Sequence, residues 1–415
     1  MASTKKYETT LLILCPSQHF VNEMKPLVNW VCALSQFIVL LVTANLFTMV
    51  LLKFILFAAL IFTTICDAAG QSKGSSSTEK DTGKIGKLVT EVLTSTILKE
   101  NRIGLNLNRN IKIYLPPDYA TSSKSYPVVY FCHNIFWNNE KMFEDGRIVK
   151  LIDSAFASGL IKEFIFVVPD YSTSTTGSIY ENSIVSGKWL DHTVNEIVPF
   201  IDKKFRTIPQ RESRAVIGEF MGGRGALKLA MTHADIFSVV YALHPVATGN
   251  GDLPWRGIGI DWEKLHNAKA YPIPGLDGRT QIFLTVSQAF LPNLNRPPLF
   301  CDFFMERENS VPKLHRENTL KSKNGFLLDE TLLESADNLR HMRGIGFDWG
   351  RFDPTQAHVV SNREFSRKLE DLGILHEAEE YRGGPYDRTW EKDGRFYTRA
   401  LPFIARYMIF ETTNP

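Results

Sequence analysis

The sequence predicts an α/β fold, with a mainly parallel central sheet flanked by helices on both faces. Between residues 100 and 410, short apolar segments alternate with segments of helical periodicity. Strands that alternate with helices pair in parallel, since each helix returns the chain to the same end of the sheet. The 415 residues are 44% hydrophobic and carry a formal net charge of +2. That composition suits a large globular core and argues against nucleic acid as a partner.

Five segments are expected to form the buried strands, because each is short, apolar and rich in β-branched or aromatic residues. They are residues 127–133 (PVVYFCH), 163–170 (EFIFVVPD), 214–218 (RAVIG), 237–245 (FSVVYALHP) and 343–350 (RGIGFDWG). Ligands of parallel sheets bind beyond the carboxyl ends of the strands. Several of these segments end in polar residues, so we expect a pocket there.

Two of the intervening helices have clear signals. Residues 192–205 (HTVNEIVPFIDKKF) place apolar side chains at helical spacing. Residues 361–374 (SNREFSRKLEDLGI) predict a helix that Ser361 caps and that ends before Gly373. These helices would cover the sheet.

The N-terminal segment is hydrophobic. Residues 27–66 contain a single charged side chain, Lys53. One interpretation is a membrane anchor, since about 20 apolar residues span a bilayer. The other is a signal peptide that begins at Met49 and is cleaved after Cys66 or nearby. We expect the protein to be secreted or extracytoplasmic, or alternatively anchored to the membrane by this segment alone.

The chain is therefore predicted to have three parts. Residues 1–69 form the hydrophobic leader, and residues 70–84 (GQSKGSSSTEKDTGK) have the composition of a flexible linker. Residues 85–413 form the α/β domain. That domain contains Cys132 and Cys301, and the sequence leaves open whether they form a disulfide or are two buried thiols. We predict no metal site and no cofactor, since no cluster of His and Cys has zinc-site spacing.

Residues 215–230 (AVIGEFMGGRGALKLA) have the pattern of a nucleophile elbow, in which a strand turns sharply into a helix. The elbow motif is G-x-S-x-G, with the nucleophilic serine at its centre. Here the motif positions are Gly218-Glu219-Phe220-Met221-Gly222, so phenylalanine replaces serine. A bulky residue is costly at the strained apex. We therefore expect either a relaxed turn or a ring that plugs the pocket.

The order of these segments resembles the esterase family of α/β-hydrolases, which includes carbohydrate esterases, feruloyl esterases and S-formylglutathione hydrolase. Three blocks carry the resemblance: IKIYLPPDYATSSKSYPVVYFCHN (111–134), YENSIVSGKWLDHTVNEIVPFIDKKFRT (180–207) and SRAVIGEFMGGRGALKLAMTHADIFSVVYALHP (213–245). AFLPNLNRPPLFCDF and LEDLGILHEAEEYRGG fit the later blocks. The resemblance implies the α/β-hydrolase fold over most of residues 100–410.

The resemblance also assigns the catalytic positions. Phe220 stands where the family has its nucleophilic serine, and Pro385 stands where it has its catalytic histidine. Asp353 is at the position of the triad acid, with Asp348 as the alternative register. The backbone N–H of Met221 would donate to the oxyanion. Phenylalanine is no nucleophile and proline has no titratable group, so Ser-His-Asp hydrolysis is predicted lost.

Two functional hypotheses follow. The first is a pseudoenzyme that binds a ligand or partner through the inherited cleft, such as a small molecule or a carbohydrate or aromatic ester-like compound. The second is an active ester hydrolase or lyase-like enzyme with a rewired site. Its candidate residues are His244, His133, Glu219 and Asp353, whereas the candidate ligand contacts are Asn134, Arg224 and Trp189.

Overall fold

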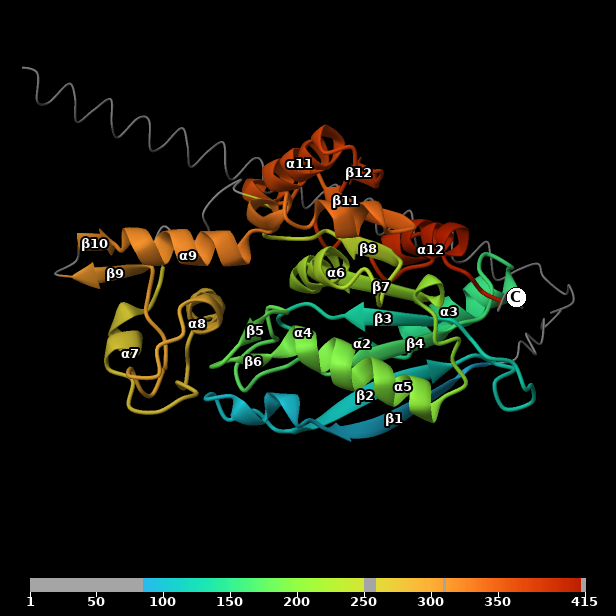
Figure 1. The fold of residues 1–415 in the computed structure, drawn as a ribbon, viewed down its shortest axis with the longest axis horizontal. Helices are drawn as coiled ribbons and strands as arrows, with labels where there is room; N and C mark the ends of the chain where they lie inside the picture. Colours follow the sequence, from blue (N-terminus) through green and yellow to red (C-terminus); the bar gives the residue numbers. More distant parts are fainter. Residues whose placement is uncertain (1–84, 250–258, 309–310, 412–415) are drawn as a thin grey trace, which may run out of the picture. The chain divides into compact units, whose positions relative to one another are not determined.

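The computed structural model describes residues 85–249, 259–308 and 311–411 (Figure 1). The chain divides into two compact units, Met1–Asp81 and Thr82–Pro415, and all described residues belong to the second. The leader and the linker up to residue 84 therefore lie outside the described residues. Among the helices that are described, none is both long enough and apolar enough to cross a membrane.

An eight-stranded sheet forms the centre of the domain, in the order β1-β2-β4-β3-β7-β8-β11-β12. The pairs β1–β2 and β2–β4 are antiparallel, and all later neighbours are parallel. The strands are β1 (Lys87–Thr94), β2 (Asn108–Leu115), β3 (Val128–Cys132), β4 (Ile165–Pro169), β7 (Arg214–Glu219), β8 (Val239–Leu243), β11 (Gly344–Gly350) and β12 (Glu377–Tyr381). This confirms the predicted fold class.

Helices cover both faces of the sheet, and each face has its own hydrophobic core (Figure 1). One core includes α3 (Arg147–Ala157) and α12 (Leu401–Tyr407), and α2 (Asn139–Phe143) contributes to it. The other core includes α5 (Val198–Lys204), α6 (Met221–Thr232), α10 (Ala336–Arg340) and α11 (Gln356–Asp371). The sheet is thus buried on both sides, which explains why its central strands are continuously apolar.

A long excursion connects β8 to β11 beside the carboxyl ends of the parallel strands. Its described elements are α7 (Trp262–His266), α8 (Gly278–Phe290), α9 (Arg316–Phe326) and a hairpin of β9 (Met305–Glu308) with β10 (Val311–Leu314). Shorter elements elsewhere are α4 (Trp189–His192) and the pair β5 (Asn182–Ser183) and β6 (Gly187–Lys188). The excursion supplies residues to the cavity described below.

The five predicted strands correspond to β3, β4, β7, β8 and β11. The helix predicted at residues 192–205 is present: α4, a π-helical segment at Thr193–Ile197 and α5 follow one another without a gap and end at Lys204. The predicted start at Ser361 was wrong: α11 begins at Gln356, and Ser361 is buried inside it. Its predicted end holds, since Gly373 follows with a φ of +64°. Cys132 and Cys301 are both buried free thiols, so they form no disulfide.

Candidate active site

The nucleophile elbow has kept its backbone geometry. β7 ends at Glu219, α6 begins at Met221, and Phe220 between them has a φ of +54° and a ψ of −114°. Two glycines make the turn possible by close approach. A Cβ on Gly218 would lie 1.9 Å from the carbonyl oxygen of Gly222, and a Cβ on Gly222 would lie 1.9 Å from that of Cys132. The turn has therefore not relaxed around its bulky apex residue.

The Phe220 ring is sandwiched between two other rings. It stacks on Tyr386 with 4.1 Å between ring centroids and on His244 with 4.8 Å. Only 9% of Phe220 is exposed, whereas Tyr386 is 56% exposed and covers it from outside. Tyr386 is the neighbour of Pro385, so an exposed aromatic side chain follows the position that the resemblance assigns to the catalytic histidine. The apolar Phe220 ring thus occupies the position that the motif gives to the nucleophile.

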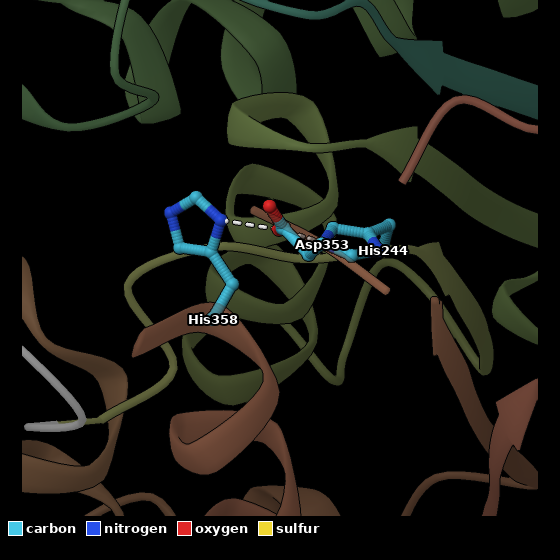
Figure 2. Close-up of side chains that lie close together, drawn as sticks. All are labelled: His244, Asp353 and His358. Carbon is cyan, nitrogen blue, oxygen red and sulfur yellow. Dashed lines mark hydrogen bonds and ion pairs between the residues drawn. The ribbon is translucent and has the colours of Figure 1, made fainter. Parts of the chain in front are cut away.

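Asp353 lies in the loop between β11 and α11 and is almost fully buried. Its Oδ2 accepts hydrogen bonds from His244 Nε2 and from His358 Nδ1, each at 2.8 Å (Figure 2). Its Oδ1 accepts one from the Thr355 N–H at 2.7 Å. Burial opposes ionisation, but these three donors hold the pKa of the Asp353 carboxyl well below its usual range. Asp353 is therefore an ionised carboxylate that accepts hydrogen bonds from three protein donors.

The alternative acid, Asp348, is excluded by its position. It lies within β11, where it accepts hydrogen bonds from the Tyr241 hydroxyl and from Arg395. Burial raises the pKa of Asp348, although Arg395 acts in the opposite direction. Asp348 does not line the cavity, whereas Asp353 does.

His244 cannot act as a free base in this arrangement. Its Nδ1 accepts a hydrogen bond from the Gly350 N–H at 3.0 Å, so the ring proton sits on Nε2 and is donated to Asp353. The ring thus has no lone pair left for a substrate proton. His244, Asp353 and His358 also place three potential metal-ligand atoms within 4.8 Å. The same hydrogen bond from Gly350 opposes that use, because Nε2 of His244 carries a proton rather than a lone pair.

The other proposed bases also have different surroundings from those expected. His133 is buried, with Nδ1 bonded to the Asn134 carbonyl and Nε2 accepting from the Tyr171 N–H, each at 2.9 Å. Burial lowers the pKa of His133, which keeps the ring neutral. Glu219 is the last residue of β7 and shares a face of the sheet with Ile217, which packs in the core that includes α3 and α12. Burial raises the pKa of Glu219 to about 7, while a hydrogen bond from Thr389 opposes the shift.

Two of the three expected ligand contacts are structural residues. Arg224 is fully buried, and its guanidinium donates to the carbonyls of Ile179, Gly325 and Phe326 and to Glu181. Trp189 is 2% exposed and donates its indole N–H to the Ser186 carbonyl. Neither lines the cavity at the elbow. In this structure both side chains are instead hydrogen-bonded within the fold.

A cavity of about 630 Å³ opens in front of the elbow. It brings together the three triad positions, the oxyanion position and one expected ligand contact, which are Phe220, Pro385, Asp353, Met221 and Asn134. Its apolar wall includes Ile135, Phe136, Val246, Ile282, Phe326, Leu327 and Tyr386. Its polar lining includes Arg279, Thr355, His358 and Ser361. His244, His133 and Glu219 do not line it.

Tyr386 and His358 are among the cavity residues that the sequence did not predict, and they matter most to the site. Tyr386 directly follows the position of the missing histidine, which is a usable signal. His358 lies five residues after Asp353 and belongs to no motif. Only the first turn of α11, which starts at Gln356, turns its ring toward the carboxylate.

Comparison with known proteins agrees with this architecture. Residues 104–393 match the sequence profile of the "Putative esterase" family. An esterase of Mycobacterium tuberculosis is 27% identical over 278 residues, which cover 67% of this chain and 52% of that protein. A xylanase/feruloyl esterase of Xylanibacter ruminicola is 29% identical over 131 residues, 30% of this chain and 18% of the relative. The chain thus spans about half the length, or less, of these relatives.

Two solved structures share the fold. A ferulic acid esterase superposes with a TM-score of 0.54 and 22% identity, covering 78% of this chain and 99% of the other. An S-formylglutathione hydrolase from Staphylococcus aureus gives a TM-score of 0.51 and 13% identity, covering 77% and 99%. With the profile match over most of the domain, the elbow and the cavity at the strand ends, this chain belongs to the esterase family of the α/β-hydrolase superfamily.

Proposed function

We propose that this domain is a pseudoenzyme with respect to ester hydrolysis, and that it binds a small apolar molecule in the inherited cavity. The observation that carries the proposal is the Phe220 ring, stacked between His244 and Tyr386 at the apex of an intact elbow. Loss of a triad serine alone costs about a million-fold in rate, and loss of the histidine then adds little. The residual contribution of binding and oxyanion donors is about 10³–10⁴ over water.

The cavity has the properties of a ligand site rather than of a collapsed remnant. Its volume of about 630 Å³ lies within the range of roughly 300–1,000 Å³ that small-molecule pockets occupy. Phe136, Phe220 and Tyr386 offer aromatic surfaces, and Asn134 and Thr355 offer polar atoms. A flat aromatic or ester-like compound matches this lining. Relatives named as feruloyl or ferulic acid esterases support the same ligand class.

The rewired enzyme built from His244, His133, Glu219 and Asp353 has less support. Both ring nitrogens of each histidine are hydrogen-bonded within the protein, and Glu219 does not line the cavity. Of that set, Asp353 alone reaches the cavity.

The hydrophobic leader supports a location outside the cytoplasm, with any membrane contact through residues 27–66. Expression of the full chain with a C-terminal tag tests this. Recovery from the medium or periplasm with a new N-terminus near Cys66 indicates cleavage. Recovery in the membrane fraction with the leader intact indicates an anchor, and recovery in the cytosol contradicts the proposal.

Ligand binding is tested with the fluorescent probe 1-anilinonaphthalene-8-sulfonate. We expect saturable fluorescence enhancement with the wild-type chain and a loss of at least about tenfold in affinity with Ala357→Trp, which fills the cavity from α11. Ala120→Trp is the matched control, since Ala120 is exposed and outside the cavity. Equal binding by all three proteins would show that the probe sits elsewhere and would contradict the proposal.

A further inference from the structure

His358 combines three properties that no other described histidine shares. It lines the cavity, its side chain is 25% exposed, and its Nδ1 donates to the Asp353 carboxylate at 2.8 Å. Figure 2 shows that its second ring nitrogen points away from Asp353. Within the described part of the chain, that nitrogen, Nε2, has no hydrogen-bond partner.

This arrangement reproduces the acid–histidine half of a catalytic triad from a different place in the chain. In a triad, the carboxylate accepts from Nδ1–H, which fixes the tautomer and leaves the lone pair on Nε2 directed at the reacting group. Asp353 does the same for His358. The base therefore comes from α11, on the opposite side of Asp353 from His244, and not from the loop after β12, where Pro385 stands.

We propose that His358, oriented by Asp353, is a general base that removes a proton from a molecule bound in the cavity. The proposal rests on the proposed function, because the substrate must occupy that cavity. With no nucleophile at the elbow, the dyad would serve proton transfer and elimination rather than acyl transfer. The substrate class is a flat, apolar compound with an acidic C–H beside a carbonyl or an electronegative ring atom.

The proposed proton transfer needs no co-reactant. The Nε2 lone pair takes the substrate proton, and the imidazolium that forms is stabilised by the Asp353 carboxylate. The electron pair of the broken C–H bond either forms an enolate or expels a leaving group within the substrate. The imidazolium then returns its proton to the product or to water, which restores the neutral ring.

The test uses 5-nitrobenzisoxazole, a flat aromatic probe whose reaction needs only a base. Removal of its C3 proton forms the nitrile, breaks the N–O bond and leaves a coloured phenolate. We expect saturable turnover by the wild-type chain and a decrease of about 100-fold in kcat with His358→Gln. His341→Gln is the matched control, since His341 is exposed and its ring is hydrogen-bonded to the Asp337 carbonyl, outside the cavity.

Two further variants separate chemistry from folding. In His358→Ala, added imidazole should restore turnover with saturation, because it can occupy the space of the missing ring. In Asp353→Asn, kcat should fall while KM for the probe stays unchanged, which marks Asp353 as a positioning residue. Thermal denaturation of each variant identifies any that is unfolded.

The outcomes distinguish this proposal from the proposed function. Saturable probe binding with a rate equal in wild type, His358→Gln and His341→Gln would overturn the dyad and leave ligand binding intact. A rate that rises linearly with probe concentration, with no saturation and no effect of Ala357→Trp, would overturn both proposals. A His358-dependent rate that imidazole rescues would establish the base.

Discussion

Two inherited parts of the cavity have changed in opposite ways. The elbow, residues 218–222, has the sharp strand-to-helix turn of the motif but carries Phe220 at its apex. The acid segment, residues 350–358, carries the Asp353 carboxylate, which accepts a hydrogen bond from His358 at the start of α11. The elbow backbone is held by close packing of Gly218 and Gly222, which does not depend on the side chain at its apex. The fold can therefore keep the backbone shape of a site while the side chains at its reactive positions differ.

The backbone of Phe220 is strained, with a φ of +54°. A non-glycine residue with a positive φ costs about 1–3 kcal/mol and persists only where its surroundings impose it. The stacking of Phe220 on His244 and Tyr386 offsets part of that cost. The strained residue at the apex is thus part of an aromatic stack.

The largest effect is expected at the elbow glycine. Gly222→Ala should destabilise the protein by more than about 5 kcal/mol, because the new Cβ would overlap the carbonyl of Cys132 on β3. Gly104→Ala is the control, since Gly104 also has a positive φ but no atom within 4 Å of the added Cβ. It should cost about 1 kcal/mol. Urea denaturation measures both, and equal losses would refute the packing argument.

The stability that Asp353 contributes should depend on its charge, whereas that of Gly222 depends on packing. Asp353→Ala leaves the donors of His244, His358 and Thr355 unpaired, so it should cost about 4 kcal/mol at pH 7. The native pKa of Asp353 is depressed, so its contribution is complete above the unfolded pKa of about 3.9 and is lost as pH falls further. Denaturation at pH 7 and pH 3 should therefore show a smaller mutational loss at pH 3. A constant loss would mean that Asp353 acts through packing.

Glu219, which does not line the cavity, should have the opposite effect: removing its charge should stabilise the protein. Burial raises its pKa from the ordinary value of 4.5 to about 7, so ionisation destabilises the native state as pH rises through that interval. Glu219→Gln should therefore stabilise the protein by roughly 3 kcal/mol at pH 8 and make little difference at pH 4. Thermal unfolding at both pH values tests this. Equal effects at the two values would indicate that Glu219 is already paired as an anion.

The smallest expected effect isolates the elbow's backbone strain. Phe220→Gly should be more stable than Phe220→Ala by about 1 kcal/mol, because glycine adopts a positive φ without steric cost. Both variants lose the same aromatic stack, so their difference reports the backbone alone. If the alanine variant proved the more stable, the native elbow in solution would not have this conformation.

The sequence was sufficient for the parts of the fold that are buried on both faces. β3, β4, β7, β8 and β11 are continuously apolar and were predicted. β12 (EAEEY) was not among the predicted strands, because its acidic side chains are balanced by arginines distant in sequence, as where Arg363 contacts Glu380. β1 was also missed, since only alternate residues face the core.

The candidate site was predictable only where a motif fixes the backbone. Phe220, Pro385 and Asp353 meet at the cavity, as the resemblance implied. Glu219 was misplaced because it shares a face of the sheet with Ile217 and does not line the cavity. His358 was missed because its role depends on the direction of one side chain in the first turn of a helix, which no spacing in the sequence reveals.

With Phe220 at its apex, the elbow offers no side chain that can attack an ester carbonyl. The most direct measurement is turnover of short-acyl and feruloyl esters by the purified chain beside the Phe220→Ala/Pro385→Ala double variant. We predict rates that are equal in the two proteins, since neither altered position supplies a reactive group. Turnover by the wild type that the double variant loses would contradict the account, because it would place ester chemistry at the elbow itself.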